Sequence, residues 1–241
     1  MSVDLKKEQR VSHERPRYKY SFIARCFFAV MDMVAGKTIT LPKAKLIEIL
    51  ASIPYRAWEI RQYARMTRHY RKGDLVRRAE VIMNYGRHSQ DNEYQHLLVL
   101  NEKMKEDGLE DPWYLYQPVP CIMVLCYIVM TRLMAVFCIR RAFLFNAEFE
   151  DHAEHEYARA VEEHPEWEKQ PVNNDVVRAY SDQATWADVI RRIGLDERDH
   201  MNASFALCGM DEHIVRYEGM PELPSLDAEG VKMGMMGDAG K

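Results

Sequence analysis

The sequence predicts an all-α protein, and three observations support this fold class. Glycine and proline, which interrupt helices, number only 11 and 10 in 241 residues. Apolar residues recur three or four positions apart over long stretches, which is the period of an amphipathic α-helix. Two Glu-x-x-His pairs, Glu93/His96 and Glu197/His200, lie within such stretches. At this spacing a carboxylate and an imidazole share one helical face and can reach the same metal ion.

The composition is that of a globular protein rather than a disordered chain. Hydrophobic residues make up 47% and charged residues 29% of the sequence, and the length suits one domain with a full core, or two small ones. The formal net charge of −4 predicts no nucleic-acid partner, because surfaces that bind nucleic acid are basic. The mean hydropathy of −0.41 is polar, although some segments are very apolar. Apolar and charged residues are therefore segregated along the chain.

The chain is expected to form one helical bundle domain over residues 18–212. Residues 1–17 are expected to be an N-terminal extension, and they show no apolar segment of the kind found in signal peptides. Residues 213–241 are expected to be a partly disordered C-terminal tail, because the segment from Pro221 onward is rich in Gly and Met.

Six helices are expected within this domain. Thr40 and Thr185 are suitable N-cap residues for two of them, and Pro54 should kink one helix or loosen a turn. The polar segment 165–185 is expected to be a loop. The six helices are expected over about 18–34, 41–70, 73–107, 114–139, 138–163 and 185–208.

Helices 18–34 and 114–139 are the most apolar of the six. No charged residue lies between Tyr114 and Thr131, but prolines interrupt the start of this stretch and leave about a dozen continuous apolar residues. A transmembrane helix needs about 20, so a core or interfacial helix is expected. The chain has five cysteines and no CxxC pair. They are expected to be buried small apolar residues in a reducing compartment.

The two Glu-x-x-His pairs suggest a site for two metal ions. Each pair alone is a weak signal, because chance produces about one such pair in a chain of this composition. A salt-bridged structural glutamate is the alternative for either pair taken singly. However, both pairs lie on helical faces of small or apolar residues, where an unpaired carboxylate would be costly. A bound metal ion would remove that cost.

A dinuclear carboxylate site in a four-helix bundle also needs one Glu from each of two further helices. Helix 138–163 can supply Glu150. Helix 41–70 offers both Glu48 and Glu59, which lie eleven residues apart and hence on the same side. The distance of each glutamate from the turn after this helix matches that of Glu93 about equally well, so spacing does not decide which of the two is the ligand.

Four segments share a further pattern. Residues 47–54 read IEILASIP, which is similar to LETVAxVP, and residues 92–96 read NEYQH, similar to NERMH. Residues 150–157 read EDHAEHEY, similar to EEEAIHTY, and residues 184–200 contain ATWADVI and DERDH, similar to ATLxDVV and DEAHH. These are, in order, motifs of the alternative oxidases, which are membrane-bound di-iron quinol oxidases. The chain resembles this family over about residues 20–206.

The resemblance implies a ferritin-like di-iron four-helix bundle with two additional membrane-interfacial helices, and it selects Glu48 over Glu59. It implies that Tyr157 is a catalytic, redox-active residue beside the metals and that Asn92 and Asp196 support the ligands from behind. Asp32, in a segment similar to FDxxSG, and Arg25 are candidates for lining a quinol pocket. The implied ligands of the two iron ions are Glu48, Glu93, His96, Glu150, Glu197 and His200.

The implied reaction is the oxidation of a ubiquinol-type quinol with reduction of O2 to water, without proton pumping. The family's location implies a monotopic protein in one leaflet of the inner mitochondrial or bacterial cytoplasmic membrane, as a homodimer or beside a partner in a membrane complex. Two alternatives stay open: a di-iron hydroxylase or desaturase-type oxygenase, and a metal-free, oxidase-like structural subunit. The chain departs from the family at Tyr55, which follows Pro54 where the family has Gly, and at Asp151 and His152.

Overall fold

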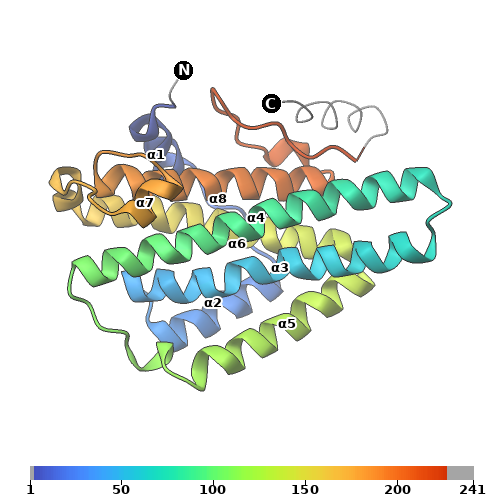
Figure 1. The fold of residues 1–241 in the computed structure, drawn as a ribbon, viewed down its shortest axis with the longest axis horizontal. Coiled ribbons are helices and arrows are strands. Elements are labelled where there is room, and N and C mark those ends of the chain that lie inside the picture. Colours follow the sequence, from blue (N-terminus) through green and yellow to red (C-terminus); the bar gives the residue numbers. More distant parts are fainter. Residues whose placement is uncertain (1–2, 227–241) are drawn as a thin grey trace.

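The computed structural model describes residues 3–226 and folds them into helices and connecting loops (Figure 1). No strand occurs among these residues, apart from an isolated bridge between Pro171 and Thr185. The predicted all-α class is confirmed. The helices of the described residues are α1 (Leu5–Glu14), α2 (Phe22–Ala35), α3 (Leu41–Arg68), α4 (Gly73–Glu106), α5 (Val119–Phe137), α6 (Ile139–Glu163), α7 (Asp175–Tyr180) and α8 (Trp186–Cys208), with 3-10 turns at Trp113–Leu115, Pro165–Lys169 and Asp211–His213.

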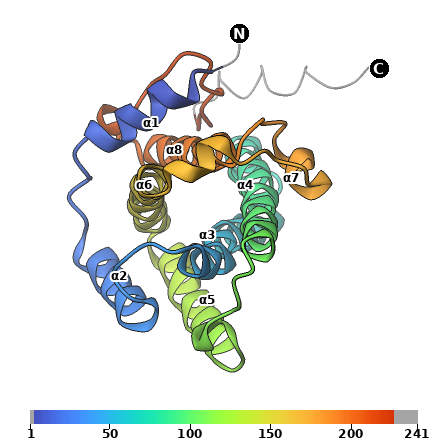
Figure 2. The same ribbon diagram turned by 90° about the vertical axis from the view of Figure 1, so that its left-hand side faces the viewer.

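Helices α3, α4, α6 and α8 form the centre of the molecule. α3 packs along α4, α6 packs along α8, and Figure 2 shows all four around a common interior. Thr40 and Thr185 cap α3 and α8 as predicted, because each side chain accepts a hydrogen bond from the backbone N–H three residues later. α3 remains helical through Pro54, so the proline does not end this helix.

Two glycines allow close contacts between the central helices. A Cβ atom on Gly86 of α4 would lie 3.3 Å from the carbonyl oxygen of Tyr55 on α3. A Cβ atom on Gly194 of α8 would lie 3.2 Å from the Cβ of Tyr157 on α6. Each glycine therefore lets its helix approach a helix that carries a tyrosine of the interior.

The segment 1–17, expected to be an extension, contains α1, which packs against α6 and α8. The contact is charged. Arg198 of α8 is fully buried and donates to Glu8 at 2.6 Å and to Glu154 at 2.7 Å. Ser12 also donates to Glu154 at 2.6 Å, and Arg15 pairs with the same carboxylate. Because α1 buries polar rather than apolar side chains, hydrophobic periodicity does not predict it.

Helices α2 and α5 lie on the same side of the four central helices (Figures 1 and 2). α5 is 19 residues long and is the one helix of residues 3–226 that is long and apolar enough to cross a membrane. It is shorter than the expected helix over about 114–139, and it begins just before Pro120, which occupies its first turn, where proline is tolerated. Both helices expose large apolar side chains, at Phe22, Ile23, Val30 and Met33 on α2 and at Ile122, Leu125, Val129, Leu133, Val136 and Phe137 on α5.

The cysteines differ from the expectation. Only Cys208 is buried, whereas Cys26, Cys121, Cys126 and Cys138 are exposed. The four exposed thiols belong to α2, to α5 or to the residue after α5. Because these helices lie outside the central four, their apolar faces are only partly covered.

Two boundaries also differ from the expectation. α2 begins at Phe22 rather than near residue 18, because Ser21 caps it and the preceding residues are extended. The segment 165–185, expected to be a loop, contains α7, which Asn174 caps. Of the predicted tail 213–241, His213 is the last residue of the 3-10 turn, residues 214–226 are irregular, and the remainder lies outside the described residues.

Candidate metal centre

Six acidic and histidine side chains from the four central helices meet in the interior. None of the six is more than 5% exposed. They form two groups in which the ligand atoms lie within 4.8 Å of one another and could hold a metal ion. Glu93 and Glu197 belong to both groups. The first group is Glu48, Glu93, His96 and Glu197, and the second is Glu93, Glu150, Glu197 and His200.

The shared residues define the layout of this centre. Because Glu93 and Glu197 belong to both groups, the two groups are neighbours and share these two carboxylates. His96 Nδ1 lies 3.4 Å from Glu93 and 3.1 Å from Glu197. His200 Nδ1 lies 2.8 Å from Glu93 and 3.8 Å from Glu197. Glu48 belongs only to the first group and Glu150 only to the second, so they lie at opposite ends of the centre.

The donor atoms of the centre lack hydrogen-bond partners. All six residues contribute at least one buried oxygen or nitrogen atom that no hydrogen bond satisfies, namely Glu48 Oε2, both oxygens of Glu93, Glu150 Oε2, both oxygens of Glu197, His96 Nδ1 and His200 Nδ1. Unsatisfied buried polar atoms are costly and rare. Their convergence fits cation binding, because a metal ion would satisfy them together. The residues therefore fit a pair of metal ions.

Burial and mutual repulsion shift the pKa values of the carboxylates. Burial raises the pKa of Glu48 to about 8, supported by the charges of Glu197 and Glu93 and opposed by His96. Burial and the same two charges raise the pKa of Glu150 well above its usual value. Burial also opposes ionisation of Glu93, but His200 and His96 outweigh it and lower its pKa to about 2.

The pKa values of the two histidines are raised, whereas burial ordinarily lowers the pKa of an imidazole. Burial lowers the pKa of His96 and of His200, but the surrounding acidic groups outweigh burial and raise both values well above the usual one. When no metal ion is bound, the acidic surroundings therefore favour the protonated form of both histidines.

Asp196 supports His96 from behind. Its Oδ2 lies 3.3 Å from His96 Nε2, so the Nδ1 atom of the same ring faces the centre. Asn92 donates to Asp196 at 3.4 Å, and Tyr180 and Arg192 donate to it as well. This arrangement fixes the ring orientation, as carboxylates behind metal-binding histidines do. Tyr180 belongs to α7, which explains why sequence analysis did not find it.

Each terminal glutamate accepts a hydrogen bond from a tyrosine on the other helix. Tyr157 of α6 donates to Glu48 of α3, and Tyr55 of α3 donates to Glu150 of α6 at 2.8 Å. Asn146 also donates to Glu150, at 3.0 Å. Tyr157 was predicted beside the centre, whereas Tyr55 was noted only as a departure from the family pattern. The signal that could have found it is Glu-x6-Tyr, which occurs at residues 48–55 and 150–157 and places both side chains on one face.

The other predicted site residues lie elsewhere. Glu59, the alternative to Glu48, pairs with Arg87 at 2.7 Å and is not part of the centre. Asp32 pairs with Lys43 at 2.8 Å, and Arg25 is exposed on α2.

A cavity of about 490 Å³ lies beside Glu48, between α3, α4 and α5. Ile49 and Ile53 of α3 and Val124 and Ile128 of α5 form much of its apolar wall. Polar lining comes from Ser52, Arg56, Thr131 and Arg132. Its size is within the range of about 300–1,000 Å³ for small-molecule sites. Neither Asp32 nor Arg25 lines it.

Comparison with known proteins adds no family assignment. No protein-family model matches the chain, and no curated protein matches it significantly.

Proposed function

We propose that this protein is an alternative-oxidase-like quinol oxidase with a ferritin-like di-iron bundle. The observation that carries this proposal is the pair of buried ligand groups that share Glu93 and Glu197, with Tyr157 hydrogen-bonded to Glu48. A dinuclear carboxylate centre in a four-helix bundle uses this set of four Glu and two Glu-x-x-His histidines. The motif order along the chain supports the same assignment.

Two iron ions are the proposed cofactors. Carboxylate oxygen and imidazole nitrogen suit iron among the redox-active metals. When bound, the di-iron centre would supply the electron transfer by which two quinols and one O2 become two quinones and two waters. Glu48 and His96 would hold one ion, Glu150 and His200 would hold the other, and Glu93 and Glu197 would contribute to both sites.

The chain's own residues prepare the site in three ways. The burial of all six ligands excludes bulk water from the reacting groups. Asp196 holds His96 in one orientation. Tyr157 holds a proton on its hydroxyl beside Glu48, because burial and the Glu48 charge keep its pKa well above the usual value. We propose that this hydroxyl, which lies beside Glu48, donates a proton and an electron during the reaction.

We place the quinol in the cavity beside Glu48. Its walls are apolar, which suits a quinone ring and its tail, and Arg56 and Arg132 offer donors to the quinol oxygens. One wall is α5, whose other residues expose an apolar face. We therefore propose that α2 and α5 insert into one leaflet of an inner mitochondrial or bacterial cytoplasmic membrane and that quinol enters from there. A homodimer or a complex partner would also contact this side.

Iron stoichiometry and quinol-dependent O2 uptake test the proposal. Purified protein loaded anaerobically with Fe2+ should hold two irons per chain and consume O2 with a ubiquinol analogue in the presence of cyanide. Glu93→Ala should lose both iron and activity, since Glu93 belongs to both ligand groups. Glu59→Ala, which removes a carboxylate of the same helix as Glu48 outside the centre, is the matched control and should retain both.

Two outcomes would contradict the proposal. An active Glu93→Ala protein would remove the site assignment, and fewer than two irons per chain would favour the metal-free structural subunit. Transfer of labelled oxygen from O2 into an organic substrate, without quinol oxidation, would instead identify an oxygenase on the same bundle.

A further inference from the structure

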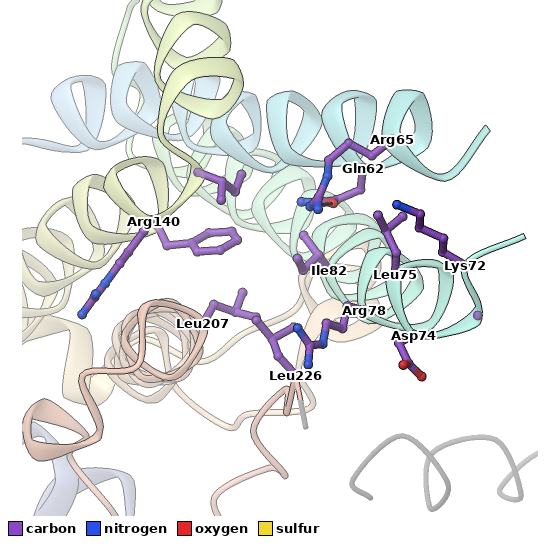
Figure 3. Close-up of a pocket in the computed structure, with 13 residues that line it drawn as sticks. Gln62, Arg65, Lys72, Asp74, Leu75, Arg78, Ile82, Arg140, Leu207 and Leu226 are labelled. Atoms are coloured by element: carbon purple, nitrogen blue, oxygen red, sulfur yellow. Dashed lines mark hydrogen bonds between the residues drawn. The ribbon is translucent and has the colours of Figure 1, made fainter. Parts of the chain in front are cut away.

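A second cavity, of about 740 Å³, lies at the end of the central helices where α3 connects to α4 (Figure 3). The start of α6 and the end of α8 complete its lining. None of the six residues of the metal centre lines it. The cavity is therefore a separate feature, and its size is also within the range of small-molecule sites.

Four cationic side chains line this cavity. They are Arg65 of α3, Lys72 at the connection, Arg78 of α4 and Arg140 of α6. Within residues 3–226 none of the four forms an ion pair. Figure 3 shows Arg65 and Arg78 on opposite sides of the cavity, with Lys72 at one edge.

The positive charge is not balanced by the acidic residue of the lining. Among the described residues that line the cavity, Asp74 is the one acidic residue, and it pairs with Arg77, which does not line it. Arg61, one turn before Arg65, has a lowered pKa because of burial and of repulsion by Arg65. Both observations indicate excess positive charge around this end of α3.

A buried amide adds a donor without a partner. Gln62 lines the cavity and is only 1% exposed. Its Oε1 accepts a hydrogen bond from Arg65 at 3.1 Å, but its Nε2 is buried and has no hydrogen-bond partner within residues 3–226. An unpaired buried N–H group is costly, so an acceptor bound in the cavity would stabilise it.

The remaining wall is apolar. Ile82, Phe143 and Leu207 are buried residues of the central helices, and Leu226 covers them from one side. A small inorganic anion would leave this wall in contact with water, and a neutral lipid would leave the cations and the Gln62 amide without an acceptor.

We infer that this cavity binds a single-chain amphiphile with an anionic head group, either a carboxylate or a phosphate. The head group binds Arg65 and the Nε2 of Gln62, Arg78 adds positive charge from across the cavity, and the alkyl chain lies along Ile82 and Leu207. This site is independent of the metal centre and of the proposed oxidase activity, and it assigns a second ligand class to the protein.

Equilibrium dialysis of the full chain tests this inference. The probes are decanoate, decyl phosphate, decanol and inorganic phosphate. One equivalent of decanoate or decyl phosphate should bind per chain, and the tighter of the two identifies the head group. Decanol and inorganic phosphate should each bind about tenfold more weakly or worse, because each lacks one half of the recognised chemistry.

Charge-matched variants locate the binding. Arg65→Ala/Arg78→Ala should weaken binding of the tighter probe by about tenfold or more. Arg68→Ala/Arg71→Ala removes the same charge from exposed residues of the same hairpin that do not line the cavity, and it should leave the dissociation constant within about twofold. Gln62→Glu, which is nearly isosteric, should weaken binding by repelling the head group. Circular dichroism of each variant verifies folding.

Three results would overturn the inference. They are the absence of binding by both anionic amphiphiles, inorganic phosphate binding as tightly as decyl phosphate, and equal binding of the tighter probe by the wild type and the Arg65/Arg78 variant. The last result would place the amphiphile elsewhere, for example on the apolar face of α5. Binding by a Glu93→Ala protein, whatever its oxidase activity, keeps this test separate from the proposed function.

Discussion

At the residue scale, the hydrogen bonds between Tyr157 and Glu48 and between Tyr55 and Glu150 give the centre two matching ends. In each case a tyrosine two helical turns after one glutamate donates to the glutamate of the other helix. The orientation of an outer ligand therefore depends on a helix that carries the opposite ligand. These two hydrogen bonds couple the positions of α3 and α6.

Tyr55→Phe is expected to loosen the end of the centre that holds Glu150. The substitution keeps the ring, which packs against Trp58, but removes the hydroxyl that Glu150 accepts from. Loss of such support behind a ligand costs about 10–100-fold in metal affinity. Competition with a chelator for Fe2+ should show this loss, whereas Tyr63→Phe, at an exposed tyrosine of the same helix, should bind iron like the wild type. If both variants bound Fe2+ with the same affinity, the Tyr55 hydroxyl would have no role in metal binding.

Cys208 should make the protein less stable at alkaline pH. Burial raises the pKa of its thiol to about 11, above the usual value of 9.0. The folded chain thus keeps a proton that the unfolded chain loses between about pH 9 and 11, so the stabilising contribution is complete below pH 9 and declines up to pH 11. The decline amounts to about 3 kcal/mol at most.

Cys208→Ala should remove this pH dependence. Urea unfolding of the wild type and the variant at several pH values between 8 and about 11 gives the difference in free energy of unfolding. That difference should shrink as pH rises through the window. A difference that is constant with pH would contradict the assigned cause.

At the element scale, the docking of α1 depends on buried charges rather than on apolar contacts. Glu154 is fully buried and accepts from Arg198, Arg15 and Ser12. Removal of one member of a buried ionic cluster leaves the others uncompensated and typically costs about 3–5 kcal/mol. The same cluster keeps α1 against α6 and α8, which both carry residues of the metal centre.

Glu154→Gln should therefore lower the free energy of unfolding by about 3 kcal/mol and release α1 first. Hydrogen exchange should accelerate in residues 5–14 before it changes in α3 or α4. Glu162→Gln alters a glutamate of the same helix whose side chain is 61% exposed and pairs with His13, and it should change stability by no more than about 0.5 kcal/mol. If hydrogen exchange in residues 5–14 were no faster than in α3 and α4 in either variant, the buried charges would not be what holds α1 in place.

The exposed apolar stripe of α5 should control membrane binding. Leu125 and Val129 lie one turn apart and are each more than half exposed. Leu125→Glu/Val129→Glu should strongly reduce co-sedimentation with phosphatidylcholine vesicles, because charged groups are costly in the acyl region. Asn84→Glu, an exposed position on α4, is the control. Unchanged sedimentation of the α5 variant would place the membrane contact elsewhere or remove it.

At the scale of the whole molecule, the metal centre joins two helix pairs. α3 and α4 supply Glu48, Glu93 and His96, and α6 and α8 supply Glu150, Glu197 and His200. In the metal-free protein, burial and the neighbouring charges raise the pKa values of the two histidines, Glu48 and Glu150, so the protonated forms of these groups are favoured. Metal ions would replace those protons and hold both helix pairs together.

Iron loading at pH 7 should accordingly release protons and raise the melting temperature. About two to four protons per chain should appear in a weakly buffered titration with Fe2+, because ligands must lose their protons to bind. Glu93→Ala should show a much smaller release and little thermal shift. Metal uptake without proton release would contradict the protonated state of the metal-free centre.

Local patterns in the sequence were enough to predict several features. The 3.6-residue period predicted α2 to α6 and α8, although not α1 or α7, and Glu-x-x-His placed a carboxylate and an imidazole on one face of α4 and of α8, because both features depend only on geometry within one helix. The apolar content of α2 and α5 likewise showed that these helices differ from the rest.

Contacts between helices could not be deduced in the same way. Glu48 and Glu59 lie on the same side of α3, and the level of α3 relative to α4 and α8 places only Glu48 in the centre. The Tyr55 hydrogen bond, the docking of α1 and the cationic cavity with Gln62 each need two or more elements at a set distance and rotation. Composition and periodicity therefore determined the helices and the class of metal ligand, whereas the mutual packing of the helices decided which side chains meet.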